Sequence, residues 1–392
     1  MGPGFIVAMV DNDAGGITTY SVAGAHFGYQ LLWTLIPVTL VLIIIQEMCA
    51  RLGVISGKGL SDLIRESYGA KITFYLLIAL LVTNLGTVVA EFSGIASAAE
   101  IFSIPRYVAV PLCALFVWLV IVKGSYRSVE KVFLLGSVLY ISYLISGFLA
   151  GPDWGEVWKS TFVPQITFSK DYLFIVVGLI GTTITPWMQF YLQASIVEKG
   201  VKVENYQYAK WDVIFGSFMT NVVAFFIIIA SAATLFTHGI TIDSASDAAV
   251  ALAPFAGKFA SILFAIGLLV ASLLGAMILP ISTAYSLCEG MGFESGVNKT
   301  FREAPWFNGI FTAIIVFGAV PAIFPQTPLI RVMLFSQVLN GILLAPVLIF
   351  IILLINKKWL MGEHVNKPWY NVVAWASVAI LIVLSAIIVF GG

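Results

Sequence analysis

Charged side chains are scarce in this chain of 392 residues. Lys and Arg number 20, Asp and Glu number 20, and the formal net charge is zero. Soluble domains carry about a quarter charged residues, so this chain lacks the polar side chains that would cover a soluble globule of its size. Hydrophobic residues form 60% of the sequence, and the mean hydropathy is +1.01. We therefore expect an all-α integral membrane protein with the lipid bilayer as its surroundings and no nucleic-acid partner.

Histidine and cysteine are also rare, and their spacing excludes several kinds of site. The three histidines and three cysteines lie in separate segments without the spacing of a metal cluster: His26, His238, His364, Cys49, Cys113 and Cys288. The cysteines are expected to be buried, inert thiols. No nucleophile elbow, zincin helix or phosphate loop occurs, so neither an enzyme nor a bound cofactor is expected.

Long apolar runs are what the sequence has in abundance. Each is about 20 residues or longer and lacks the alternation of a barrel strand, so each predicts a membrane-spanning helix. The third and eighth are the longest. The eleven runs are residues 2–25, 29–50, 71–102, 106–123, 129–150, 171–198, 211–236, 256–287, 305–324, 328–355 and 369–390.

The basic residues predict how the chain is oriented. If the first run begins in the cytoplasm, 15 Lys and Arg fall in the inner connections and 5 in the outer ones. Cytoplasmic loops carry the excess of Lys and Arg, so the N-terminus is expected inside and the C-terminus outside. We expect a monomer in the plasma (inner) membrane.

The first run contains polar residues where a membrane helix should be continuous. It reads FIVAMVDNDAGGITTYSVAGA and includes Asp11, Asp13 and the glycine pair Gly15–Gly16. A carboxylate at this depth is costly, so Asp13 must face protein or water and is a functional candidate. The glycines are expected to let the chain leave helical geometry and expose carbonyl groups. The alternative is a glycine pair for helix packing beside a neutralised Asp13.

The sixth run is interrupted too. In LIGTTITPWMQFYLQASIV, Pro186 and the preceding Gly181 and threonines break the helix. A proline kink alone would be common in a membrane, but paired interruptions in two five-helix halves point to inverted repeats with a binding site between them. We expect one transmembrane domain, 1–392, made of repeats 1–150 and 171–355 with an additional helix at 369–390.

Several stretches resemble one transporter family. They are GPGFIVAMV, Asp13-Ala14-Gly15-Gly16, AGAHFGYQLLW, QEMCARLGVISGKGLSDLIRESYG, AEFSGIASAAEIFSIP and LFSQVLNGILLAPVLI. Together with the interrupted sixth helix, they resemble the NRAMP divalent-metal transporters. The resemblance implies the leucine-transporter (LeuT) fold, with five-plus-five inverted repeats, broken helices 1 and 6, and transport by alternating access.

The chain departs from the family at the metal-binding motifs. The family's DPGN is DAGG here, so Gly16 replaces an asparagine. Its MPHN becomes Thr185-Pro186-Trp187-Met188, so Thr185 replaces the metal-binding methionine and Trp187 a histidine. Thioether sulfur favours softer metals, whereas oxygen ligands and water suit Mg²⁺ and Mn²⁺. The chain is therefore identified as a member of the NRAMP-related magnesium transporter branch, which binds a partly hydrated ion.

The expected ion shell combines side chains with backbone carbonyls at the unwound ends. For Thr185, the alternative to binding the ion is a hydrogen bond back to its own helix. For Gln189 and Gln337, the alternative is a hydrogen bond between two helices. The proposed shell residues are Asp13, Gly16, Val10, Gly181, Thr182, Thr185, Gln189 and Gln337, the last two acting through water.

In comparison with the family, the proton relay is expected to be broken. The family's histidine is Trp187 here, and Val88 stands where a further acid is usual, although Glu91 is kept. Uncoupled facilitated diffusion is therefore expected. Glu47 and Glu91 are expected to pair with Arg51 or to be hydrogen-bonded in neutral form. Asp11 is expected to line a charged vestibule, with a solvated wall as the alternative.

Three alternative functions stay open at this point. One is an ordinary proton-coupled Mn²⁺/Fe²⁺ symporter. The second is an amino-acid or organic-cation transporter of the same fold, although an acid at the first break favours a metal cation. The third is a Mg²⁺ sensor that binds the ion without transporting it.

Overall fold

The computed structural model describes residues 2–123 and 138–390, and within these ranges it is built from helices alone. Eight helical segments in the described ranges are long and apolar enough to cross a membrane: Leu32–Ser56, Ala70–Ile101, Lys170–Glu198, Val203–His238, Ala245–Met291, Pro305–Ile323, Leu329–Ile355 and Pro368–Phe390. They match eight of the eleven predicted runs. The all-helical, membrane-type prediction is thereby confirmed.

The other three runs do not form long, continuous apolar helices in the described ranges. Run 2–25 is divided into α1 (Pro3–Val10) and α2 (Ala14–Phe27). Run 106–123 forms α6 (Arg106–Lys123), which has a shorter apolar stretch. Run 129–150 begins outside the described residues and continues as α8 (Ile141–Leu149). The count of eleven spanning helices therefore stays a prediction.

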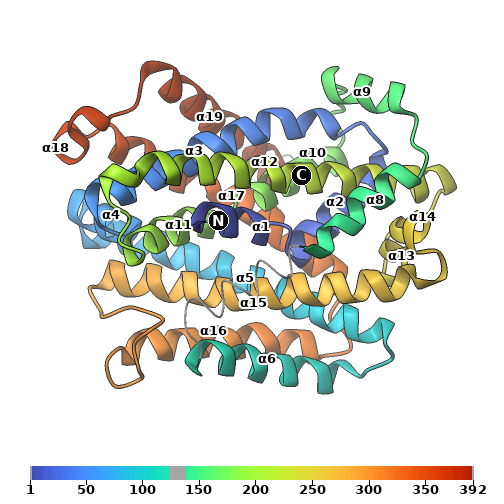
Figure 1. Ribbon diagram of the computed structural model, residues 1–392, viewed down its shortest axis with the longest axis horizontal. Helices are drawn as coiled ribbons and strands as arrows, with labels where there is room; N and C mark the ends of the chain where they lie inside the picture. Colours follow the sequence, from blue (N-terminus) through green and yellow to red (C-terminus); the bar gives the residue numbers. More distant parts are fainter. Residues whose placement is uncertain (1, 124–137, 391–392) are drawn as a thin grey trace.

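Two groups of helices pack on either side of the interrupted ones (Figure 1). On one side lie α5 (Ala70–Ile101) and α15 (Ala260–Met291), each of 32 residues and the longest as predicted, with α6 and α16 (Pro305–Ile323). On the other lie α3 (Leu35–Ser56) and α12 (Tyr206–Thr234). Between them are α1 and α2, α10 (Lys170–Thr183) and α11 (Pro186–Glu198), with α17 (Leu329–Ile355) against α10 and α5.

Glycines let the central helices approach backbone to backbone. A Cβ atom at Gly4 would lie 2.9 Å from the Cα of Val213, and one at Gly216 would lie 2.8 Å from the Cα of Phe5. These positions join α1 to α12. Such small-residue contacts are how membrane helices pack closely without a hydrophobic driving force.

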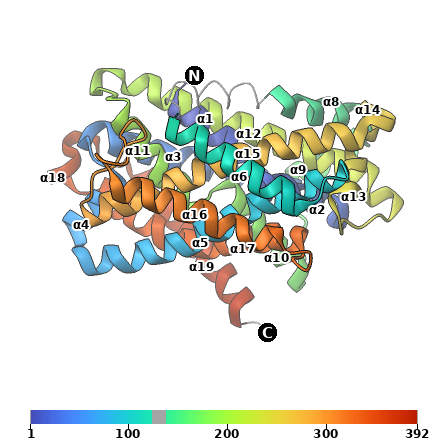
Figure 2. The ribbon, with the colours of Figure 1, turned by 90° about the horizontal axis from the view of Figure 1, so that it is seen from below.

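The short helices mark the two ends of the molecule. In Figure 1, α4 (Leu60–Tyr68) and α18 (Lys358–Met361) lie at the left, where the connections rich in Lys and Arg gather. At the right lie α9 (Trp154–Phe162), α13 (Ala245–Ala249) and α14 (Ala253–Ala256). The left end is therefore the predicted cytoplasmic side. Figure 2 shows α19 (Pro368–Phe390) extending to the C-terminus at the edge of the bundle.

Candidate cation site

The first interruption spans three residues, Asp11 to Asp13, between α1 and α2. Asp13 is the N-cap of α2, and its Oδ1 accepts a hydrogen bond from the Gly16 backbone N–H at 2.8 Å. The interruption itself is confirmed. Its position differs from the expectation, because Gly15 and Gly16 lie inside the first turn of α2 and keep helical geometry.

The two glycines allow neighbouring groups to lie close to the α2 backbone, and they do not unwind the helix. A Cβ at Gly15 would overlap the Nε2 atom of Gln337, and a Cβ at Gly16 would lie 2.5 Å from the Asp11 carbonyl oxygen. The same Gly16 Cβ would lie 3.3 Å from the Thr182 hydroxyl. The absence of a side chain at Gly16 thus lets the start of α2 lie close to the end of α10.

The second interruption consists of Ile184 and Thr185, between α10 and α11. Pro186 opens α11, where its missing N–H costs no helical hydrogen bond. The Thr185 hydroxyl is buried and has no hydrogen-bond partner among the described residues, and the same holds for the Thr182 hydroxyl in the last turn of α10. The alternative that Thr185 bonds back to its own helix is therefore wrong. Thr183 does so instead, with its hydroxyl donating to the Leu179 carbonyl at 2.8 Å.

Gly181, near the end of α10, allows α10 to pack closely against α17. A Cβ there would overlap the Gln337 carbonyl oxygen and the Gly341 backbone nitrogen of α17. Any substitution would push α10 away from α17, so the glycine serves packing whether or not its carbonyl faces an ion.

Three buried carboxyl groups lie around the first interruption: Asp11 is 1% exposed, Asp13 2% and Glu91 0%. Glu91, from α5, accepts a hydrogen bond from the Ala14 backbone N–H at 3.3 Å and neighbours the Asp13 carboxyl group. Within the described ranges no basic side chain pairs with these acids. The alternative of Asp11 in a solvated wall is therefore wrong, and the expectation that Glu91 pairs with Arg51 is wrong as well.

Several oxygen atoms here are buried without a hydrogen-bond partner in residues 2–123 and 138–390, although buried polar groups normally have one. They are both carboxylate oxygens of Asp11, the Asn12 amide oxygen, Glu91 Oε1 and the hydroxyls of Thr182 and Thr185. The Val10 carbonyl lies at the C-terminal end of α1, where helix carbonyls lack partners and carry partial negative charge. The set offers hard oxygen donors to a cation.

The acids by themselves do not complete a ligand set. In the part of the chain that the structure describes, no three His, Cys, Asp or Glu side chains are grouped to hold a metal ion. Hydroxyls, backbone carbonyls and water would have to supply the other ligands, as is usual for Mg²⁺.

The two glutamines predicted for the ion shell form hydrogen bonds with other side chains. Gln189 Oε1 accepts from Gln46 Nε2 at 3.3 Å and from the Cys49 thiol at 3.4 Å, so it joins α11 to α3. Gln337 lies over Gly15, and its Oε1 accepts from Asn340 Nδ2 at 3.1 Å. The interhelical alternative thus describes Gln189, whereas Gln337 contacts the first turn of α2.

Two further predicted residues lie elsewhere. Glu47 forms an ion pair with Arg51, 3.1 Å from Nε to Oε1, as one of the two expectations stated. Trp187 is fully buried in α11, and its indole N–H has no partner in the described part.

Several contacts at the first interruption were not predicted. The Asn12 side-chain amide donates to the Thr220 hydroxyl of α12 at 2.6 Å, and the Tyr140 hydroxyl donates to the Asn12 carbonyl at 2.8 Å. These bonds hold the unwound segment against two neighbouring helices. The only signal in the sequence was the polar Asn12 between two acids.

The chain was compared with known proteins. The profile of the natural resistance-associated macrophage protein-like (Nramp) family matches residues 4–391. The divalent metal cation transporter MntH of Klebsiella pneumoniae is 27% identical over 401 residues, covering 100% of this chain and 94% of its own length. MntH of Bacillus subtilis is 26% identical over 402 residues, with coverage of 99% and 91%.

Solved structures share the fold. The manganese transporter of Eremococcus coleocola, in complex with an aromatic bis-isothiourea compound, aligns with a TM-score of 0.81 at 23% identity, covering 98% of this chain and 85% of that one. Mhp1, a nucleobase-cation-symport-1 family transporter, aligns with a TM-score of 0.61 at 14% identity, with coverage of 98% and 91%. Because the family profile spans nearly the whole sequence, this chain belongs to the Nramp family.

Proposed function

We propose that this protein transports divalent cations, Mg²⁺ and also Mn²⁺, across a membrane. The observation that carries the proposal is the burial of three carboxyl groups near the first interruption, those of Asp11, Asp13 and Glu91, without a basic partner in the described ranges. Uncompensated acids inside a membrane bundle are costly and are kept where they serve an ion or proton pathway. The relatives named as divalent metal cation transporters support the same function for this chain.

The preference for magnesium rests on the donors at the two interruptions. Residues 11–13 and 184–185 contribute carboxylate, amide and hydroxyl oxygens, with no thioether or imidazole among their side chains. Gly16 adds no side chain of its own. Mg²⁺ dehydrates reluctantly and keeps several waters, so a shell of one or two carboxylates with oxygen dipoles and water suits it. This chemistry supports our proposal that the chain belongs to the magnesium branch of the family.

Transport without protons is the second part of the proposal. Val88, one turn before Glu91 on α5, is buried against Gly318 of α16 and cannot carry a proton. Trp187 replaces the family's histidine. The membrane potential alone would drive a divalent ion inward, since it is worth about 4.6 kcal/mol per 100 mV for two charges.

Alternating access is the mechanism that we propose, with residues 1–150 and 171–355 as inverted repeats and 369–390 as an additional helix. The helix ends beside the two interruptions approach each other at Gly16 of α2 and Thr182 of α10, and the acids nearby are closed off from solvent. An ion held there would be occluded. Opening to one side then requires the short helices α1, α2, α10 or α11 to move relative to the long helices.

A second candidate is a proton-coupled Mn²⁺ symporter. The observation in its favour is Glu91, which keeps a second carboxyl group beside Asp13. Such a pair could exchange a proton as the metal binds.

Ion flux separates these candidates. Purified protein in liposomes would be tested with a magnesium-sensitive dye and, in parallel, a pH-sensitive dye. Mg²⁺ influx without acidification that disappears in Asp13→Asn supports the proposal. The matched control is Asp171→Asn, an exposed acid in the first turn of α10, which should transport normally. Mn²⁺ entering with protons while Mg²⁺ stays outside would instead support the symporter.

A further inference from the structure

A polar cavity of about 280 Å³ opens at the predicted cytoplasmic end, away from the cation site. Its walls come from α3, α12, the segment after α18 and the start of α19. Among the residues lining it are Glu47, Arg51, Tyr206, Lys210, Lys367 and Trp369.

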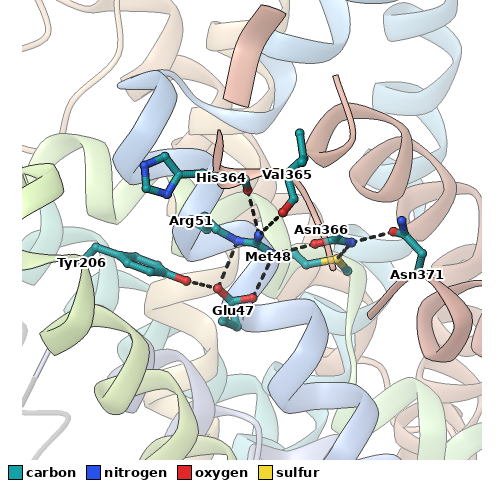
Figure 3. Close-up of polar contacts among 8 residues, drawn as sticks. All are labelled: Glu47, Met48, Arg51, Tyr206, His364, Val365, Asn366 and Asn371. Carbon is teal, nitrogen blue, oxygen red and sulfur yellow. Dashed lines mark hydrogen bonds and ion pairs between the residues drawn. The ribbon is translucent and has the colours of Figure 1, made fainter. Parts of the chain in front are cut away.

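Hydrogen bonds from Arg51 of α3 fix the segment 364–366, which forms one wall of the cavity (Figure 3). Its Nη1 donates to the backbone carbonyls of His364 and Val365 at 2.8 and 3.2 Å, and its Nη2 donates to Asn366 Oδ1 at 2.5 Å. Nη2 also donates to Glu47 Oε2 at 3.1 Å, and the Tyr206 hydroxyl donates to Glu47 Oε1. The charges of Arg51 and Glu47 therefore cancel.

Two lysines in the same cavity have no direct partner in the described ranges. Lys210 and Lys367 side chains make no hydrogen bond or ion pair within the described ranges. The exposed Glu363 offsets one of these charges. The first turn of α19 adds the partial positive charge of a helix N-terminus, since Lys367, Trp369 and Tyr370 at its start also line the cavity. The cavity is thus net positive.

We propose that this cavity binds the phosphate-bearing headgroup of an anionic phospholipid from the cytoplasmic leaflet. Basic pockets between membrane helices on that side suit such headgroups. A lipid is favoured over free phosphate because the cavity adjoins α19, most of whose surface faces away from the protein. Trp369, 51% exposed at the start of α19, lies where aromatic side chains meet lipid headgroups.

Bound lipid would join three elements that are distant in sequence. Lys210 belongs to α12, whereas Lys367 precedes α19 and is held through Asn366 to Arg51 of α3. A phosphate between the two lysines relieves their repulsion and stabilises the docking of α19 on the bundle.

Native mass spectrometry tests the proposal directly. Protein would be equilibrated with phosphatidylcholine alone or with added phosphatidylglycerol, and the retained lipid counted. A lysine close to the lipid phosphate contributes a factor of about five to binding, so Lys210→Gln with Lys367→Gln should weaken phosphatidylglycerol retention about 25-fold. The matched control, Lys202→Gln with Lys358→Gln, removes two charges on the same side but outside the cavity and should retain the lipid.

Thermal unfolding in nanodiscs gives a second readout. Phosphatidylglycerol should raise the unfolding temperature of the native protein and of the control pair, but not of the cavity pair. Equal retention or equal stabilisation in the cavity pair would overturn the proposal. Inorganic phosphate that stabilises the protein in phosphatidylcholine as strongly as phosphatidylglycerol does would overturn the assignment to a lipid.

Discussion

Replacing Asp212 should loosen the first half-helix, α1, from the bundle. The Asp212 carboxylate, on α12, accepts hydrogen bonds from the backbone N–H groups of Gly2 at 2.6 Å, Gly4 at 2.8 Å and Phe5 at 3.1 Å. These amides have no partner within their own helix because they lie at its N-terminus. Gly2 itself offers no capping side chain. A neighbouring helix therefore supplies the cap of α1.

The magnitude follows from the three bonds. An N-cap is worth about 0.5–2 kcal/mol, and a hydrogen bond to a charged group about 1.5–3 kcal/mol. Asp212 is only half-buried, so we expect a loss of about 2 kcal/mol in Asp212→Ala, which favours undocked α1 by a factor of up to about 30. Asp212→Asn keeps one acceptor oxygen and should lie between the two.

Hydrogen exchange of the α1 amides measures this effect. We expect the amides of residues 4–10 to exchange about 10- to 30-fold faster in Asp212→Ala, whereas those of α5 should be unchanged. Glu204→Gln, an exposed acid at the same end, serves as the control. Unchanged protection of α1 in Asp212→Ala would show that packing at Gly4 and Gly216, and not the cap, holds this helix.

Three further substitutions test the interior. Gly15→Ala should cost about 1–3 kcal/mol by overpacking against Gln337, reduce transport, and regain part of it in combination with Gln337→Ala, as flux assays would show. Thr185→Met should raise affinity for Cd²⁺ relative to Mg²⁺, measured by calorimetry; an unchanged ratio would place Thr185 outside the ion shell. Arg51→Met should cost about 3–5 kcal/mol by leaving Glu47 buried and unpaired. Adding Glu47→Leu should recover much of that loss in thermal unfolding, whereas no recovery would contradict the pairing.

Local chemistry made part of this protein predictable. An apolar run of about 20 residues is long enough to cross a bilayer as a helix, whatever packs beside it. The sequence therefore predicted the eight long apolar helices. The polar residues and Pro186 within two of the runs predicted the interruptions. Asp13 and Glu91 were candidates because an acid in such a run is costly wherever it faces.

Contacts between distant segments decided the rest. Gly15 and Gly16 suggested unwinding, yet Asp13 caps α2 and both glycines lie in its first turn. Gln337 and the Asp11 carbonyl leave no room for a side chain at these two positions. Thr183 and Thr185 have the same chemistry. Because α10 ends between them, the first bonds back to its helix, while the second has no partner in the part of the chain that the structure describes.

The sequence by itself therefore determined the class, the membrane segments and the acids that mark the first interruption. Tertiary structure decided which oxygens are free for a cation, which glutamine joins two helices, and that Asp212 caps α1 from about 200 residues away. The physical reason is that hydropathy is a property of each segment. Hydrogen bonds inside a membrane bundle depend on which donors and acceptors the packed helices bring within 3 Å or so of each other.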